Sequence, residues 1–193
     1  MMTSLATTSM TTLTPGGKSF VATLPGAEPI PFIGGTGVFD PFGLTPESKE
    51  EVLMFREAEL AHSRVAMMGA LGYLVQSHFA PMFDMGDAPV IRHLDLVLKS
   101  EMGQLGAVSL LFGIFFSEIY RARTGWMEPE VEMRSLRESY SPGDLGFDPL
   151  GQKPKDEAGL KSMQEKELRN GRLAMIAIAG MTVQELVTGQ QIF

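Results

Sequence analysis

Two short stretches combine a carboxylate, a neutral lone-pair side chain and an arginine at the same spacing. The first is ELAHSRVAM, residues 59–67, and the second is ELRNGRLAM, residues 167–175. Five of the nine positions are identical, and His62 and Asn170 occupy the same place in each stretch. A neutral nitrogen or oxygen lone pair can bind a metal, and an arginine can neutralise the carboxylate beside it.

The donors at His62 and Asn170 suit a metal that needs one more ligand. The chain has no Cys, so a thiolate site is excluded. The sequence also shows no close set of three or four ligands of the kind that holds zinc. A magnesium macrocycle, with four positions already filled, would accept one oxygen, amide or imidazole donor. The alternative is that both side chains only form hydrogen bonds within a helix bundle.

The charges need partners because they lead into apolar segments. Glu59 and Arg64 are five residues apart, about 140° around a helix, which makes a poor pair within one helix. If the two helices cross at this level, Glu59 can meet Arg172 and Glu167 can meet Arg64. Small residues such as Gly171 allow a close crossing. We therefore predict two reciprocal interhelical ion pairs.

A second motif repeats with the same offset. Phe-Asp-Pro-x-Gly occurs at 39–43 and at 147–151, and both motif pairs are 108 residues apart. Chance similarity would not preserve the spacing between two motifs. The sequence therefore contains a tandem duplication of a loop followed by a helix.

Three helices should position these motifs. Thr45, followed by Pro46 and an acidic residue, predicts the N-cap of the first helix. Met102–Ile119 is almost wholly apolar and long enough to cross a bilayer, which takes about 20 residues. A buried core helix is the alternative. The expected helices are residues 46–77, 101–122 and 156–188.

These features predict an all-α membrane protein with three transmembrane helices. The first and third helices should cross and be related by pseudo-two-fold symmetry. We expect residues 1–36 to form an N-terminal arm and residues 37–193 to form the three-helix domain. His78 and His93 match no motif, so surface or loop positions are expected for them, with binding of a peripheral pigment as the alternative.

Charge and composition narrow the class of function. The net charge is -7 and the basic residues form no dense run, so nucleic acid is not an expected partner. No nucleophile–base set or phosphate-binding loop appears, so we do not expect an enzyme. The connection after the first helix carries only Arg92 and Lys99, whereas the other connecting segments are rich in Lys and Arg. The positive-inside rule then places the N-terminus in the cytoplasm or its equivalent, such as a stroma.

The sequence resembles the light-harvesting chlorophyll-binding antenna family, most closely the fucoxanthin chlorophyll a/c proteins of red-lineage algae. The two nine-residue stretches, the two Phe-Asp-Pro-x-Gly motifs and Glu118-Ile119-Tyr120-Arg121 carry the resemblance, which covers about residues 37–188. It implies a multi-pass protein of the plastid thylakoid membrane, with a stromal N-terminus and a lumenal C-terminus.

The resemblance also implies roles for single residues. The axial chlorophyll ligands would be Glu59, His62, Glu118, Glu167, Asn170 and Gln184. Gln104 is a further candidate on the middle helix, where a hydrogen bond within the bundle is equally open. The carotenoid end-group sites would be Asp40, Pro41, Phe42, Asp148, Pro149 and Leu150. Helix-entry turn chemistry is the alternative for these six. The structural ion pairs would involve Arg64, Arg121 and Arg172.

The implied function is a light-harvesting antenna subunit that passes excitation energy to a photosystem, I or II. Its partners would be the photosystem core, neighbouring antenna subunits and thylakoid lipids. The cofactors would be chlorophyll a, chlorophyll c and xanthophylls such as fucoxanthin. The chain ends soon after the third helix, which favours the red-lineage branch and with it chlorophyll c, or chlorophyll a alone, instead of chlorophyll b. One alternative is a photoprotective member that responds to lumenal acid through residues such as Asp84, Asp87 and Asp95. A small ion or proton transporter is a more distant alternative.

Overall fold

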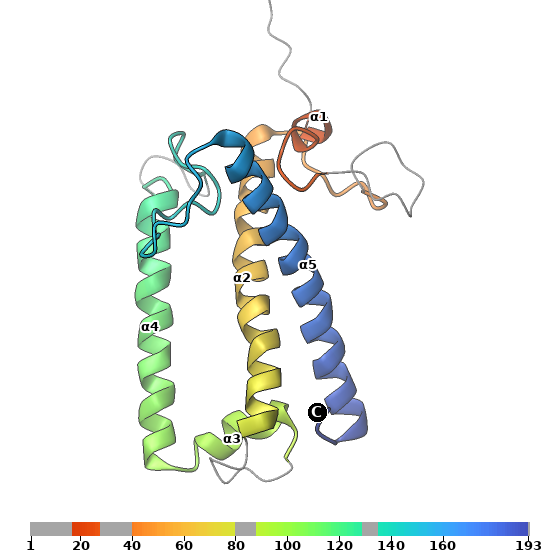
Figure 1. Ribbon diagram of the computed structural model, residues 1–193, viewed down its shortest axis with the longest axis vertical. Helices are drawn as coiled ribbons and strands as arrows, with labels where there is room; N and C mark the ends of the chain where they lie inside the picture. The colour runs from red at the N-terminus through yellow and green to blue at the C-terminus, as the bar shows by residue number, and fades with distance from the viewer. Residues whose placement is uncertain (1–16, 28–39, 80–87, 129–134, 193) are drawn as a thin grey trace, which may run out of the picture.

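The computed structural model describes residues 17–27, 40–79, 88–128 and 135–192. Within them lie three long helices, α2 (Lys49–Phe79), α4 (Glu101–Gly125) and α5 (Glu157–Thr188) (Figure 1). The short elements are α1 (Gly17–Val21), η3 (Val90–Arg92) and α3 (His93–Val97). The long helices occupy the three segments that the sequence predicts, with ends that differ by at most three residues. Asp84 and Asp87 lie outside the described residues.

The three long helices begin at side-chain caps. Ser48 Oγ accepts a hydrogen bond from the backbone N–H three residues on, at 3.3 Å, and so caps α2. The prediction that Thr45 is the cap is wrong, because the Thr45 N–H donates to the Asp40 carboxylate and the chain turns again before the helix starts. Ser100 and Asp156 cap α4 and α5 in the usual way.

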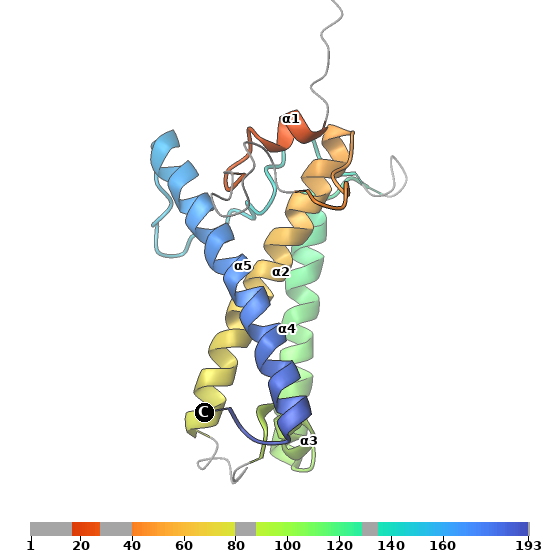
Figure 2. The ribbon, with the colours of Figure 1, turned by 90° about the vertical axis from the view of Figure 1, so that its right-hand side faces the viewer.

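Helices α2 and α5 pack against each other and cross, and α4 stands beside them (Figures 1 and 2). Ser63 and Gly171, which are equivalent in the repeat, meet at the crossing. Ser63 is fully buried, and a Cβ added at Gly171 would lie 2.3 Å from the Ser63 Cβ. The close approach of the two backbones therefore depends on glycine at this position. Two equivalent pairs are buried on either side: Leu60 with Leu168, and Ala66 with Ala174.

Helix α4 is the apolar element. Among the described residues it has no extensive packing against α2 or α5. It is also the one helix of the described part that is long and apolar enough to cross a membrane, and none of its 18-residue apolar window is buried. Helices α2 and α5 do not meet this criterion, and both carry several charged residues in their first halves.

Residues 88–100 of the connection between α2 and α4 are described. Its element η3 packs against the ends of α2 and α5. The expectation of a surface or loop position is wrong for His93, which lies in α3, is 3% exposed and has its Nε2 2.9 Å from the Ala88 carbonyl oxygen. The side chain of His78 lies outside the described residues. Beside η3, Glu185 is 1% exposed and accepts a hydrogen bond from the Ile91 N–H at 3.0 Å.

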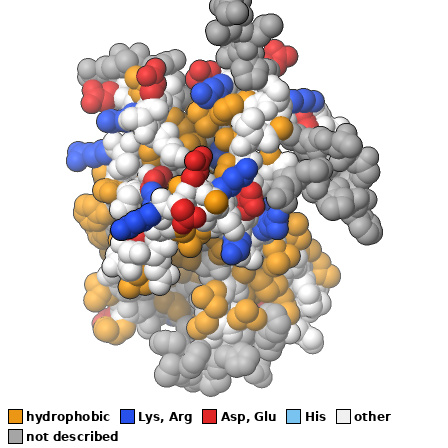
Figure 3. Space-filling view, turned by 45° about the horizontal axis from the view of Figure 1, so that its top comes forward, with side chains coloured by type: hydrophobic (Ala, Val, Ile, Leu, Met, Phe, Trp, Pro, Cys, Tyr) orange, Lys and Arg blue, Asp and Glu red, His pale blue; other side chains and the backbone are white. Residues whose placement is uncertain are grey.

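Charged side chains gather at the end of the molecule where α2 and α5 begin, and hydrophobic side chains cover the helices below (Figure 3). Leu71, Leu111 and Ile176, one on each long helix, are all more than 60% exposed. An apolar surface of this extent marks contact with a membrane, a ligand or another protein.

Candidate functional site

Two reciprocal ion pairs join α2 and α5. Arg64 Nε lies 2.8 Å from Glu167 Oε1, and Arg172 Nε lies 2.8 Å from Glu59 Oε1. These are the two pairs that the sequence predicts. Both carboxylates are partly exposed, at 27% for Glu59 and 29% for Glu167. Each arginine thus neutralises a carboxylate through one of its oxygens, and the second oxygen of Glu59 lies 3.4 Å from Arg56 Nη1.

Each of these arginines has a second acceptor that the sequence analysis missed. The Gly143 carbonyl accepts from Arg64 Nη2, and the Gly26 carbonyl accepts from Arg172 Nη1, both at 2.8 Å. Both glycines follow a proline and have positive φ angles, 76° at Gly26 and 82° at Gly143. They are 117 residues apart instead of 108, so the repeat alignment does not pair them. The Pro-Gly dipeptide, a turn signal, was the available clue.

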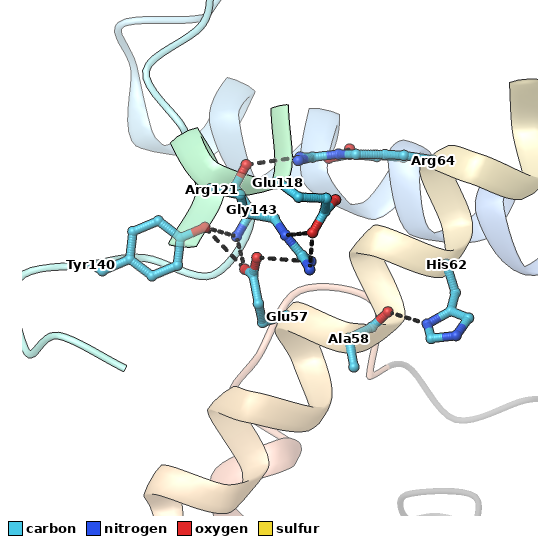
Figure 4. A network of polar contacts seen from close by, with 9 residues as sticks. Glu57, Ala58, His62, Arg64, Glu118, Arg121, Tyr140 and Gly143 are labelled. Carbon is cyan, nitrogen blue, oxygen red and sulfur yellow. Dashed lines mark hydrogen bonds and ion pairs between the residues drawn. The ribbon is translucent and has the colours of Figure 1, made fainter. Parts of the chain in front are cut away.

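His62 projects from α2 with a fixed tautomer. Its Nδ1 lies 2.7 Å from the Ala58 carbonyl oxygen (Figure 4). A carbonyl can only accept, so Nδ1 carries the proton and Nε2 keeps its lone pair. The ring is exposed, as is the side chain of Asn170 on α5. Both side chains can therefore offer a neutral donor to a group outside the helix pair.

A buried glutamate forms a second polar network near this site. Glu57 is 3% exposed and accepts hydrogen bonds from Tyr140 Oη at 3.0 Å and from the Gly143 N–H at 2.7 Å. Arg121 of α4 reaches it with Nη1 at 3.7 Å (Figure 4). Burial, together with the negative charge of Glu57, raises the pKa of Tyr140 to about 12. The sequence analysis missed Glu57, because nothing local separates it from a solvated glutamate in the first turns of a helix.

The Asp-Pro-x-Gly segments at 40–43 and 148–151 form equivalent turns. Asp40 accepts hydrogen bonds from the N–H groups four and five residues on, at 2.8 and 3.1 Å. Asp148 does the same at 3.0 and 2.9 Å. These hydrogen bonds favour the ionised carboxylates, so the pKa of each Asp lies below its usual value, with the Thr45 contact the largest cause at Asp40 and the Lys153 N–H the largest at Asp148.

A cavity lies beside each turn. One, of about 700 Å³, is lined by Asp40, Pro41 and Phe42 together with Glu59 and Arg172. The other, of about 540 Å³, is lined by Asp148 together with Arg64 and Glu167. Pro149 and Leu150 do not line this second cavity, and Leu150 is 78% exposed. Each cavity therefore combines a turn from one repeat with one of the two ion pairs.

Comparison with known proteins identifies the family. Residues 22–186 match the family described as chlorophyll A-B binding protein. The chain belongs to this chlorophyll-binding family. The resemblance inferred from the two repeated motifs is thereby confirmed.

Named relatives of this chlorophyll-binding chain are of more than one kind. Light-harvesting complex stress-related protein 1 of Chlamydomonas reinhardtii is 45% identical over 183 residues, which cover 91% of this chain and 69% of the relative. A fucoxanthin-chlorophyll a-c binding protein of Isochrysis galbana is 44% identical over 158 residues, which cover 79% and 74%. Chlorophyll a-b binding protein 7 of Solanum lycopersicum is 29% identical over 180 residues, which cover 86% and 65%. The first two match almost equally well, so identity does not separate the stress-related from the fucoxanthin branch.

The remaining candidate ligands lie on α4 and α5. Glu118 is 55% exposed and pairs with Arg121, whose Nη2 and Nε lie 2.7 and 3.1 Å from its Oε2. Gln104 donates from Nε2 to the Leu98 carbonyl at 2.8 Å, a bond to the segment that precedes α4, and its Oε1 is the atom that could bind a metal. Gln184 is exposed on α5. The carboxylate and amide oxygens at these positions fit the magnesium of a chlorophyll, which needs one axial ligand.

Proposed function

We propose that the chain is a light-harvesting antenna subunit of the plastid thylakoid membrane. Helices α2, α4 and α5 would each span the membrane, with pseudo-two-fold symmetry between α2 and α5, a stromal N-terminus and a lumenal C-terminus. Chlorophylls and carotenoids held by the helices would pass excitation energy to a photosystem core and to neighbouring antenna subunits. The chain itself catalyses no reaction, since the pigments carry the chemistry and the protein positions them.

The exposure of α4 carries this proposal. Its apolar window is exposed all round, including on the side towards α2 and α5. Lipid can cover the outward face, but the inward face needs another apolar partner. Chlorophyll and carotenoid rings are such partners, and Glu118 and Gln104 on α4 offer them donor atoms.

The ligand assignment rests on the donor geometry. His62 has a free Nε2, Asn170 has an exposed amide, and the carboxylates of Glu59, Glu118 and Glu167 are each neutralised by an arginine. A neutralised carboxylate can bind magnesium without leaving a net charge in an apolar environment, where an unpaired charge costs about 2.5–3.5 kcal/mol. Gln184 would complete the set on α5.

The two cavities support carotenoid end-group sites. Each combines apolar walls with an aspartate turn and an arginine, so a ring that carries oxygen atoms could dock there. We propose chlorophyll a, chlorophyll c and xanthophylls such as fucoxanthin as the pigments. The support for chlorophyll c and fucoxanthin is the 44% identity to a protein named for these pigments.

The test is pigment analysis of purified protein. Chlorophyll per polypeptide should fall by about one in His62→Leu and by about one in Asn170→Leu, since each chlorophyll takes one axial ligand. Gln76→Leu, an exposed polar position on the same helix as His62, is the matched control and should lose none. A colourless wild-type protein would refute the antenna function, and unchanged chlorophyll in His62→Leu would refute that ligand.

A photoprotective role is the second candidate, favoured by the buried carboxylate of Glu185. Its Oε2 accepts from the Ile91 N–H, while its Oε1 is buried without a hydrogen-bond partner in the described structure. Arg92, His93 and Asp95 are the charged or titratable residues of η3 and α3, and Tyr73 Oη of α2 lies 3.0 Å from Thr182 Oγ1 of α5. The stress-related relatives at 45% identity add support.

The excited-state lifetime of the purified complex at neutral and acid pH separates the two roles. A lifetime that shortens at acid pH in the wild type, and shortens less in Glu185→Gln, supports photoprotection. A lifetime that does not depend on pH supports the antenna role alone.

A further inference from the structure

We propose that Glu57 is a positioning residue for the pigment site at Glu118 and acts through Arg121. The inference rests on the proposed ligand role of Glu118. Glu57 lies outside the repeated ion pairs, and the polar network around it is drawn in Figure 4.

Arg121 connects an exposed carboxylate to a buried one. Its Nη2 and Nε hold Glu118, and its Nη1 points to Glu57 at 3.7 Å. The side chain of Glu118 is 55% exposed, whereas that of Glu57 is 4% exposed. A planar guanidinium can face two carboxylates at once with fixed geometry, which a flexible ammonium cannot do. The orientation of Glu118 is therefore set from the buried end of the network.

Glu57 is itself held firmly. Tyr140 Oη and the Gly143 N–H both donate to its Oε2, and the Gly143 N–H also lies 3.2 Å from Tyr140 Oη. A buried carboxylate with these donors and a facing cation is stable, but loss of one partner leaves a buried charge uncompensated. Because the Gly143 carbonyl accepts from Arg64, the same turn joins Glu57 to the Arg64–Glu167 pair.

The position of α4 makes this link important. Helix α4 lacks extensive packing against α2 and α5 among the described residues, so packing does not fix its rotation. The described contacts at this end of α4 include Arg121 with Glu57, Tyr120 Oη with the Leu145 carbonyl at 3.0 Å, and the Gly125 carbonyl with the Arg137 N–H at 2.9 Å. A rotation of α4 would turn Glu118 away from its present direction, and the contact with Glu57 opposes it.

The repeat supplies a matched control. The equivalent of Glu57 is Glu165, also a glutamate and half-buried, 108 residues later. Helix α4, which carries Arg121, is not part of the repeat, so the contact of Glu57 with Arg121 has no equivalent at Glu165. Glu57→Gln keeps an oxygen that accepts hydrogen bonds but removes the charge that faces Arg121, so it isolates the ion pair from the turn contacts.

The experiment compares Glu57→Gln, Glu165→Gln and Glu118→Leu in purified pigment–protein complexes. The difference spectrum of Glu118→Leu against wild type defines the absorption band of the Glu118 chlorophyll. In Glu57→Gln that band should shift or broaden while the others stay in place. Hydrogen exchange of residues 118–128 should accelerate about tenfold, the effect of about 1.4 kcal/mol on a local opening. Glu165→Gln should leave both readouts unchanged.

The outcomes separate this inference from the proposed function. Unchanged chlorophyll in Glu118→Leu refutes the ligand role, and the pigment-positioning role with it. An unchanged Glu118 band in Glu57→Gln overturns the positioning role while leaving the ligand role intact. Loss of all bands together shows a general structural role and also overturns it. If Glu57→Gln does not assemble, Tyr140→Phe removes one donor to Glu57 and should shift the same band less.

Discussion

The largest effect of a single substitution should come from Arg64→Leu. The change removes the 2.8 Å contact with Glu167 and the 2.8 Å hydrogen bond to the Gly143 carbonyl. Breaking a buried ion pair costs about 3–5 kcal/mol, and hydrogen bonds to charged groups contribute about 1.5–3 kcal/mol. Glu167 is 29% exposed, which reduces the penalty of leaving it unpaired. We expect a loss of about 3 kcal/mol, which corresponds to about 6–12 °C in Tm for a chain of this size.

Arg172→Leu should cost less, although it removes the equivalent contacts. Glu59 keeps a second cation, because Arg56 Nη1 lies 3.4 Å from its Oε2. Among the described contacts, Glu167 has no second cation once Arg64 is removed. We expect Arg172→Leu to be milder by about 1 kcal/mol, the scale of one weakly screened ion pair.

Thermal unfolding of the purified complexes, followed by circular dichroism at one scan rate, measures both changes. Arg64→Lys keeps the charge but cannot bind the carboxylate and the carbonyl with one planar group, so its Tm should fall between those of wild type and Arg64→Leu. Arg123→Leu, an exposed position near the end of α4, is the control and should shift Tm by less than about 2 °C. A Tm for Arg64→Leu within that margin of wild type would refute the role of the reciprocal ion pairs in stability.

Three further predictions test other parts of the site. His62→Asn, which exchanges the imidazole for the donor found at the equivalent position, should retain most of the chlorophyll that His62→Leu loses; equal losses in pigment analysis would contradict a ligand role. Gly171→Ala should destabilise the protein by about 1–3 kcal/mol through overpacking against Ser63. Adding Ser63→Gly to the same chain should restore much of the lost Tm. If the second change left the destabilisation unaffected, that would argue against contact at the crossing. The depressed pKa values of Asp40 and Asp148 contribute stability that is present above their unfolded pKa of about 4 and is lost as pH falls through the folded values. Protection of the two turns against hydrogen exchange, measured relative to the intrinsic rate at each pH, should therefore fall below about pH 4 in wild type but not in Asp40→Asn/Asp148→Asn, and equal pH profiles would count against this linkage.

The sequence predicts the crossing of α2 and α5 because the repeat encodes it twice. Glu59 and Arg64 make a poor pair within one helix, so each needs a partner elsewhere, and the second copy supplies partners at the same spacing. The three long helices could also be predicted, since each combines a capping residue with a long apolar stretch. The exact start of α2 was not, because Thr45 donates its N–H to Asp40 and the helix begins later.

Contacts that depend on loop length could not be predicted from the sequence. Gly26 and Gly143 serve equivalent arginines, yet different numbers of residues separate them from the repeated motifs that follow. A repeat alignment compares positions at a fixed offset and cannot pair them. Glu57 was missed for another reason: its partners Arg121 and Tyr140 lie on α4 and in the loop before α5. Sequence periodicity does not reveal contacts between such distant segments.

The duplication explains both the symmetry of the site and its limit. Two equivalent helices can neutralise each other's carboxylates by exchanging arginines, and this requires only that Ser63 and Gly171 permit a close crossing. Helix α4 has no duplicate, so residues that contact it cannot obey the symmetry. Glu57 and Glu165 are the same amino acid at equivalent positions, but Glu57 faces Arg121 of α4. On this view, single contacts and pigments hold α4 in position, and helix packing does not. Its pigment sites should then be the first to be lost under mild denaturation, before the α2–α5 crossing opens. Stepwise detergent or heat treatment, with pigment loss compared against loss of helical circular dichroism, tests that order.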